Sequence, residues 1–261
     1  MQMTLSKSVS SFLNDFSRRV RFILPQKAVG MYIYGSVALE AFNSNKSDLD
    51  FVVFLQEELD KKELRALKEL HRQLVKTSPY GEKLDGMYLQ ENHAGKDNKN
   101  QPQYPYCENG KIKTGYWDVN GITWWMIKHR GIDLFGPPAE ELDLEESFEQ
   151  VEKTLDYNLT YYWADKAGSR KNFVKDEDVE FAVLTIARIL YSIDRKDIVS
   201  KEAALNWLQG QSMEKWETLL SEAKRLRTGN QEKMLYSNRT ARAKECRLFA
   251  EEMIKNYKES K

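Results

Sequence analysis

The chain has 261 residues, which is enough for one large domain or for two smaller ones with their own hydrophobic cores. Forty Lys and Arg residues balance forty Asp and Glu residues, and 41% of the residues are hydrophobic. The zero net charge argues against a protein that binds nucleic acid or an anionic membrane, and the composition argues against disorder. We therefore expect a soluble globular protein whose specificity comes from a local site.

The sequence shows no targeting signal and no metal or disulfide pattern. Charges recur every few residues through the first 24 residues, which therefore lack the apolar core of a signal peptide. No stretch approaches the roughly 18 apolar residues of a membrane span, so we expect a cytoplasmic protein. We expect the two cysteines to be free thiols, and the three histidines have no metal-ligand spacing (Cys107, Cys246, His71, His93 and His129).

The predicted elements of the first half alternate between helix and strand. Apolar residues recur every three or four positions over 4–23, which predicts an amphipathic opening helix. A second helical pattern, with acidic residues in its first turn, covers 57–77. Two short apolar runs and one alternating run predict three strands, with a short helix between the first two (28–34, 49–55 and 83–90).

The second half is predicted to be helical. The segment 91–116 is rich in Asn, Lys, Gly and Pro and is expected to be a long loop, either functional or mobile. A helix with Asp118 as candidate N-cap follows, and Gly-Pro-Pro at 136–138 marks the boundary between domains 1–140 and 141–261. Further helical segments then predict a bundle (145–166, 176–194, 200–209, 213–227 and 231–258). The predicted fold class is an α+β domain with a small mixed β-sheet, followed by an all-α helical bundle domain.

One segment of the first domain has a pattern that packing alone does not explain. In MYIYGSVALEAFNSNKSDLDFVVF, residues 31–54, a strand leads into Gly35 and Ser36, where the backbone can approach a phosphate and a hydroxyl can donate to it. Asp48 and Asp50 stand two positions apart at the start of the next strand, so both carboxylates project from one face. Two carboxylates this close favour a cation between them, and Mg²⁺ prefers such hard oxygen ligands.

A third acid, Asp85, lies in the strand predicted over 83–90. It is placed to complete either a two-metal site or a metal site with a general base. A Gly-Ser turn or an Asp-x-Asp at a strand edge is, by itself, more often ordinary turn chemistry. Their combination in this order, with eleven residues between the two motifs and a later acidic strand, favours nucleotidyl transfer.

The segment YGSVALEAFNSNKSDLDFVVF resembles the signature of the DNA polymerase β-type nucleotidyltransferase superfamily, which is Gly-Ser, a gap and Asp-x-Asp. Three segments of the second half, LFGPPAEEL, DVEFAVLTIARILYS and IVSKEAALNW, resemble the bacterial aminoglycoside adenylyltransferases that modify streptomycin and spectinomycin. The similarity runs in patches over nearly the whole chain. It implies an antibiotic-resistance enzyme that transfers AMP from ATP to a hydroxyl of one or both drugs.

The resemblance implies roles for residues at the matching positions. Asp48 and Asp50 would bind Mg²⁺, two ions in all, and Asp85 stands where the family has a glutamate that acts as catalytic base. We count Asp85 among the metal ligands as well. Nucleotide binding is expected of the Gly-Ser turn, of the serine before Asp48 and of two basic residues in the helical domain, with Asp118 as a weaker candidate (Gly35, Ser36, Ser47, Arg188 and Lys201).

The drug site is expected on the acidic segment of the helical domain. Asp178 matches an acidic residue that the family places against its cationic drug, and Glu180 lies in the same acidic cluster. Such a cluster also suits the N-terminus of a helix. Phe181 stands where many members carry a polar residue and Arg227 where an aromatic residue is expected, so the sequence leaves the drug open. Trp117 receives no role.

The implied reaction is in-line attack of a substrate hydroxyl on the α-phosphorus of ATP, in a cleft between the domains, with Asp85 as base. One alternative is an enzyme of the same fold that modifies a protein or an RNA end, although no long basic stripe favours RNA. A second is a nucleotide-binding regulatory module without turnover. No heptad run or exposed apolar stripe predicts a protein partner, so a monomer is expected.

Overall fold

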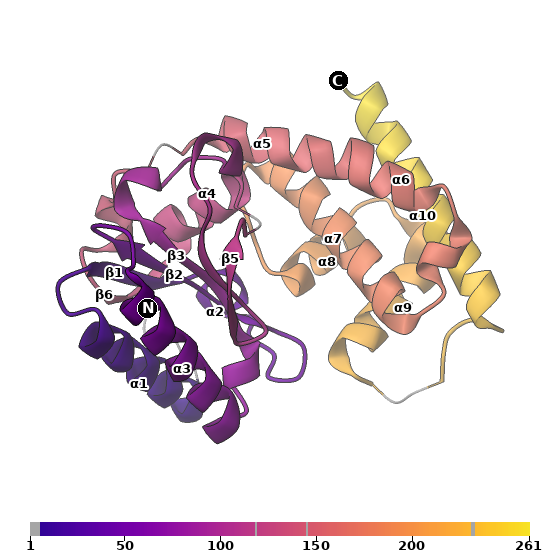
Figure 1. Cartoon of the computed structure of the whole chain (residues 1–261). Coiled ribbons are helices and arrows are strands. Elements are labelled where there is room, and N and C mark those ends of the chain that lie inside the picture. Colours follow the sequence, from indigo (N-terminus) through magenta and orange to yellow (C-terminus); the bar gives the residue numbers. More distant parts are fainter. Residues whose placement is uncertain (1–5, 118, 145, 231–232) are drawn as a thin grey trace. The chain divides into compact units, whose positions relative to one another are not determined.

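The computed structural model describes the whole chain apart from residues 1–5, 118, 145 and 231–232. The chain divides into two compact units, residues 1–151 (unit 1) and 152–261 (unit 2). Strands and helices alternate in unit 1, and the regular elements described in unit 2 are helices (Figure 1). The predicted fold class is therefore confirmed. The domain limits 1–140 and 141–261 stay a prediction.

Unit 1 is built on a mixed sheet with the strand order β5-β4-β3-β2-β1-β6. Its strands are β1 Ala28–Ile33, β2 Leu49–Leu55, β3 Leu84–Gln90, β4 Tyr104–Glu108, β5 Lys111–Gly115 and β6 Ile132–Phe135. Strands β2 and β3 pair in parallel, and the other described pairs are antiparallel. Parallel pairing places the beginnings of β2 and β3, where the predicted acids lie, at the same edge of the sheet.

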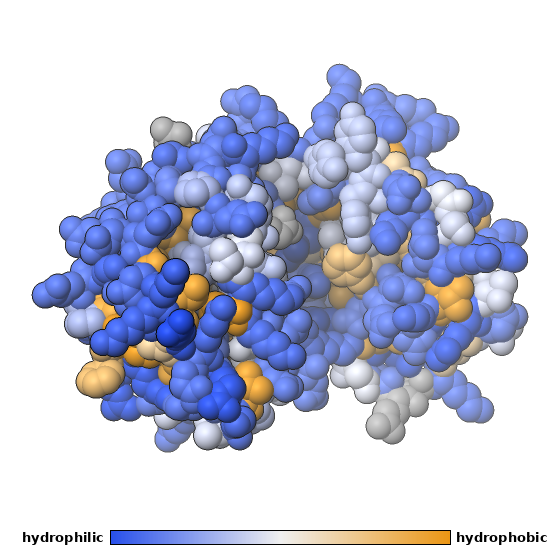
Figure 2. Space-filling view, in the orientation of Figure 1, coloured by the Kyte–Doolittle hydropathy of each residue, from blue (hydrophilic) through white to orange (hydrophobic). Residues whose placement is uncertain are grey.

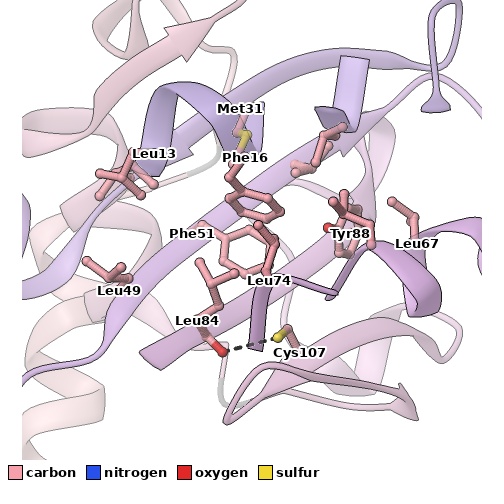
Figure 3. Packing of buried hydrophobic residues seen from close by; sticks show 14 of the residues in the cluster. Leu13, Phe16, Met31, Leu49, Phe51, Leu67, Leu74, Leu84, Tyr88 and Cys107 are labelled. Carbon is pink, nitrogen blue, oxygen red and sulfur yellow. Dashed lines mark hydrogen bonds between the residues drawn. The ribbon is translucent and has the colours of Figure 1, made fainter. Parts of the chain in front are cut away.

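Helices α1 (Lys7–Ile23) and α3 (Lys61–Thr77) share a core with one face of this sheet. The ring of Phe16 on α1 meets that of Phe51 on β2 edge-on, with 5.2 Å between centroids (Figure 3). Asp60 and Glu63 form a capping box that fixes the start of α3. The helix predicted over 4–23 is confirmed from Lys7 onward, residues 4–5 lying outside the described part of the chain, and the helix predicted over 57–77 is confirmed from Lys61 onward. Both were predictable because apolar side chains at helical spacing bury one stripe of each.

The segment 91–116 is not the structureless loop that its composition predicts. It contains the 3-10 turns Glu91–His93 and Asn98–Asn100 and the antiparallel hairpin β4–β5. Asn109 and Gly110 form the two-residue turn of the hairpin with φ values of +50° and +70°. An Asn-Gly pair between alternating residues is a strong hairpin signal, and the polar composition of an edge strand concealed it.

The helix after this hairpin begins later than predicted. Helix α4 spans Gly121–Arg130, and its N-cap is Asn120, whose side-chain oxygen accepts the N–H of Ile122 at 3.0 Å. The predicted cap, Asp118, lies outside the described residues. Strand β6 then pairs with β1, an element that the sequence did not reveal because four residues are too few to show a period.

Helix α5 (Phe148–Tyr157) leads into unit 2, whose other helices are α6 Trp163–Ala167, α7 Asp176–Arg195, α8 Lys201–Gln209, α9 Glu217–Thr228 and α10 Arg239–Glu259. The predicted segment 145–166, apart from residue 145, which lies outside the described residues, contains a π-helical turn at Asn158–Tyr162. Of the segment predicted over 231–258, residues 231–232 lie outside the described residues, and helix α10 begins at Arg239. Buried apolar side chains on one face of each long helix explain why a helical period predicted most of this unit.

Charged groups also lie inside unit 2. Arg242 and Glu222, both fully buried, form an ion pair at 2.9 Å, and Arg242 reaches Asp176 at 2.6 Å.

Figure 2 shows a mostly hydrophilic face of the molecule with scattered apolar residues. In the described part of the chain, no helix is long and apolar enough to cross a membrane.

Candidate functional site

The Gly-Ser turn and the second aspartate of the Asp-x-Asp motif meet in the structure. The short helix α2 (Gly35–Ala38) is separated from β1 only by Tyr34, and Gly35 has a φ of +65°, in the left-handed region. A Cβ on Gly35 would lie 2.0 Å from Oδ2 of Asp50, closer than two such atoms can approach. The backbone N–H of Tyr34 also donates to the Asp50 carbonyl at 3.0 Å. The Asp50 carboxylate therefore lies directly against the backbone of the turn.

Asp50 and Asp85 are neighbours on one face of the sheet. They are directly opposite each other in the parallel register of β2 and β3, whose Cα atoms lie about 4.8 Å apart in such a pair. Leu49, Phe51 and Leu84 alternate with them and are buried in the core on the other face. The predicted convergence of these two acids from adjacent strands is thus present.

Asp85 occupies an environment that suits a proton acceptor. Burial, reinforced by the negative charge of Asp48, raises its pKa to about 6, although the hydrogen bond from Asn109 works in the opposite direction. The N–H of Asn109 donates to Asp85 Oδ1 at 2.7 Å. A carboxyl group with a pKa near neutrality is a more effective general base than an ordinary exposed aspartate.

Ser36 carries a polar atom that needs a partner. Its hydroxyl oxygen is buried and makes no hydrogen bond with the described part of the chain. Leaving such a group unsatisfied costs about 1–3 kcal/mol. Because Ser36 follows Gly35 in the turn beside Asp50, an anionic ligand at this turn would satisfy the hydroxyl.

Ser47 and Asp48 end the loop that leads into β2. Ser47 is buried, and its hydroxyl accepts the N–H of Asn43 at 3.0 Å, so it also orders this loop. Asp48 is exposed. Nζ of Lys83 donates to the carbonyl of Ser47 at 3.4 Å, which brings a cation to the acidic edge. Lys83 was overlooked in the sequence, where its only signal is a position two residues before Asp85.

The acidic residues at this edge differ in how well their arrangement and their chemistry fit magnesium. Among the described residues, no group of three or more His, Cys, Asp or Glu side chains is arranged to hold a metal ion. The donor chemistry nevertheless fits, because Asp48, Asp50 and Asp85 supply only carboxylate oxygens. The close approach that Gly35 permits also keeps a carboxylate beside the backbone where a phosphate would lie.

Aromatic residues border the acidic pair. Tyr34 is buried, and burial followed by the charge of Asp50 raises the pKa of its hydroxyl well above the usual value. The Trp117 side chain is hydrogen-bonded to that hydroxyl and stacks on Tyr106 with 5.5 Å between centroids. The N–H of Trp117 donates to the hydroxyl of Tyr104 at 3.0 Å. Trp117, which received no role from the sequence, is thus ordered beside the site.

In unit 2 the predicted nucleotide-binding residues lie on α7 and α8. Asp178, Phe181 and Arg188 recur at intervals of three and seven residues on α7, so they share one face of that helix. Lys201 begins α8, and its Nζ lies 5.4 Å from the centroid of the Phe181 ring. Phe181, exposed at 44%, therefore holds a cation although it replaces a polar residue.

Glu180 is matched to a cation of its own unit. Arg227 lies 3.6 Å from Glu180 and 2.9 Å from Glu202, and its side chain is only 8% exposed. The residue that stands in place of an expected aromatic thus binds one of the two acids predicted to face the drug. Asp176, from the same acidic cluster, is held by Arg242 and has a structural role.

The two cysteines and His71 are not among the residues predicted to form the site. Both cysteines are free, as predicted, and the structure shows that both are buried. His71 lies in the core of unit 1, where its Nε2 is 2.7 Å from the hydroxyl of Tyr88 and burial lowers its pKa to about 3. His71 is therefore a neutral core residue.

Comparison with known proteins follows the division into two units. Residues 13–86 match the nucleotidyltransferase domain family, and residues 163–255 match the C-terminal domain of the aminoglycoside adenylyltransferases. The spectinomycin 9-adenylyltransferase of Campylobacter jejuni is 23% identical over 240 residues, 84% of this chain and 88% of the relative.

A solved structure has the same fold. The crystal structure of the spectinomycin adenyltransferase AAD(9) from Enterococcus faecialis, which contains ATP and spectinomycin, matches with a TM-score of 0.68. The match covers 94% of this chain and 99% of that chain, at 18% identity. The nucleotidyltransferase architecture followed by a helical region is therefore shared along nearly the whole of both chains.

Proposed function

Because the chain belongs to the aminoglycoside adenylyltransferase family, we propose that it transfers AMP from ATP to a hydroxyl of spectinomycin and thereby confers resistance to that drug. Spectinomycin is favoured because both the curated relative and the solved structure are named for it. Streptomycin, which the sequence resemblance also implies, is the second drug to test.

The observation that carries this proposal is the pairing of Asp50 with Asp85 beside the Gly-Ser turn. The phosphates of ATP would lie against Gly35, where the buried hydroxyl of Ser36 can donate to a phosphate oxygen. Asp85 would accept the proton of the attacking hydroxyl. The drug oxygen then bonds to the α-phosphorus, the bond from that phosphorus to the β-phosphate oxygen breaks, and pyrophosphate leaves.

We propose that two Mg²⁺ ions bind at this edge and that Asp48, Asp50 and Asp85 hold them. When bound, Mg²⁺ would neutralise negative charge on the phosphate oxygens. Burial is the main cause of the raised pKa of Asp85, and the negative charge of Asp48 adds to it; a bound cation would relieve the repulsion between these two carboxylates. Asp118, outside the described residues, remains a candidate at the nucleotide.

Residues of unit 2 complete the proposed roles. Arg188 and Lys201 would contact the phosphates, and Lys201 is oriented by the Phe181 ring. In unit 1, Ser47 would contact the phosphates as well. Asp178 would bind the cationic drug. Glu180 would join it only by exchanging its contact with Arg227. We propose that the enzyme works as a monomer in the cytoplasm, where ATP is available.

The test is pyrophosphate release from ATP and Mg²⁺ by the purified chain, with spectinomycin, streptomycin and other aminoglycosides as acceptors. We expect turnover with spectinomycin, detected also as an adenylylated drug by mass spectrometry, and none with the Asp48→Asn variant. Turnover with only a protein or an RNA acceptor would show that the substrate is a macromolecule and not a drug. ATP binding without any turnover would identify a regulatory module instead.

A further inference from the structure

Lys83 is a cation at the acidic edge of the sheet, and the proposed reaction gives it no role. It ends the 3-10 turn Gly81–Lys83, directly before β3. Its ammonium nitrogen lies 3.4 Å from the carbonyl oxygen of Ser47, the residue before Asp48. The side chain therefore crosses from the start of β3 to the start of β2, at the edge from which the candidate metal ligands project.

The ammonium group of Lys83 has unused donor capacity. An ammonium group has three N–H donors, and the long contact with Ser47 uses one of them. No ion pair of Lys83 occurs among the described residues, although Asp48 and Asp85 lie one and two residues from the ends of this contact. Lys83 is also partly buried, so solvent hydrates it incompletely.

A second observation at the same edge is a hydroxyl group that needs an acceptor. The hydroxyl of Ser36 is buried and unsatisfied among the described residues, and it stands in the turn that packs against Asp50. Asp50 pairs with Asp85, which is two residues from Lys83. A hydroxyl without an acceptor and an ammonium without a counter-ion among the described residues, both at the edge that carries the carboxylates, are together suited to a polyphosphate.

We propose that Lys83 is a substrate-binding residue whose ammonium group contacts the phosphate chain of the nucleotide. The proposal rests on the proposed function, since it takes ATP as the donor substrate. It adds a cation from unit 1 to the basic residues assigned in unit 2. The contact with Ser47 holds the flexible lysine stem in place and so reduces the ordering cost of binding.

Lys83 could instead serve only to hold the loop before β2, and two variants separate the roles. Lys83→Gln keeps a neutral donor for the Ser47 carbonyl but removes the charge, whereas Lys83→Arg keeps the charge. The matched control is Lys61→Gln, which removes an exposed lysine at the start of α3. Lys61 follows the far end of β2, a strand about 23 Å long, and so lies away from the acidic edge.

The measurement is calorimetric binding of ATP, inorganic tripolyphosphate and adenosine to the full chain without drug, with melting temperatures as a check on folding. In Lys83→Gln we expect about tenfold weaker binding of ATP and tripolyphosphate and unchanged binding of adenosine. Lys83→Arg should stay within about threefold of the wild type, and Lys61→Gln should match it.

Unchanged tripolyphosphate affinity in Lys83→Gln would overturn the proposal, and so would an equal loss of adenosine binding or a loss explained by a lower melting temperature. Because no drug is present, these results are independent of the acceptor. If Lys83→Gln weakens the binding of ATP and tripolyphosphate but the wild-type chain modifies no aminoglycoside, the role of Lys83 stands and the proposed acceptor is rejected. A wild-type chain that binds no ATP would reject both proposals.

Discussion

The backbone N–H of Asn109 donates a 2.7 Å hydrogen bond to Oδ1 of Asp85, so the tip of the β4–β5 hairpin holds the proposed base. The turn is anchored because the N–H of Gly110 donates to the Leu84 carbonyl at 2.9 Å. A side chain on Gly110 would lie 2.3 Å from the Gly81 carbonyl, so only glycine fits. With Oδ1 occupied, Oδ2 is the oxygen left to accept a proton.

The first prediction concerns the pH dependence of activity. Since Asp85 must be ionised to act as base and its pKa is raised to about 6, kcat/KM should rise with pH and level off above about 6. Asp85→Asn should lower kcat by at least about a hundredfold. Initial rates of pyrophosphate release between pH 5 and 8 provide the measurement. A flat profile over this range would show that Asp85 is not the base.

The second prediction is that the same substitution stabilises the fold. Burial raises the pKa of Asp85 from 3.8 to about 6, so its contribution to stability is present below pH 4 and is lost as pH rises through 6. Asp85→Asn should therefore be more stable than the wild type at pH 8, on the order of 1 kcal/mol after allowance for solvent screening. Urea unfolding at pH 8 and pH 4 checks this, because the advantage should vanish at the lower pH.

The third prediction concerns the close approach at Gly35. Gly35→Ala should displace the Asp50 carboxylate, because the new Cβ would lie 2.0 Å from Oδ2, and should abolish turnover. Gly229→Ala is the matched control, since Gly229 has a similar φ of +67° but, apart from its chain neighbours, no atom of the described residues lies within 4 Å of its Cβ position. Both variants should lose about 1 kcal/mol of stability from backbone strain. Equal turnover in the two would remove the site-specific role of Gly35.

The fourth prediction concerns acid unfolding. Burial lowers the pKa of His71 to about 3, so the unfolded chain binds a proton below pH 6.5 that the folded chain does not. Between pH 7 and 5 this group should remove about 2 kcal/mol from the free energy of unfolding. His71→Gln should lack this part of the pH dependence. Urea titrations at the two pH values give the comparison, and an unchanged slope in the variant would refute the assignment.

The fifth prediction concerns the buried ion pairs of unit 2. Arg242→Met leaves the fully buried Glu222 without one partner and should destabilise the protein by about 3 kcal/mol. Arg242 also pairs with Asp176, and Arg239 lies 3.7 Å from that carboxylate. Because Arg239 is 64% exposed, Arg239→Met should cost less than about 0.5 kcal/mol. Thermal unfolding measures both, and similar losses in the two variants would contradict the importance of burial.

Much of the fold could be predicted because its elements have local periods. The predicted strand over 49–55 matches β2, and that over 83–90 begins within one residue of β3. Alternation also predicted that Asp50 lies on the face opposite Phe51, which is buried in the core. Helices α7 and α8 were predicted with similar accuracy from apolar residues at helical spacing.

The hairpin β4–β5 was missed because its stability depends on a partner strand. Its outer strand β5 is largely exposed and carries lysines, so it has no hydrophobic pattern of its own. It is ordered by pairing of β4 with β3, in which Cys107 lies opposite Gly86. Only the Asn-Gly turn signals it in the sequence.

The sequence by itself determined the Gly-Ser turn, the acids and the order of the elements, because these depend on residue type and on spacing over a few positions. Tertiary structure decided which side chains meet. Asn109 reaches Asp85 across 24 residues and Lys83 reaches Ser47 across 36, while Arg227 reaches Glu180 from another helix. Such contacts follow from how distant elements pack against each other, and a local period of two or 3.6 residues contains no information about that packing.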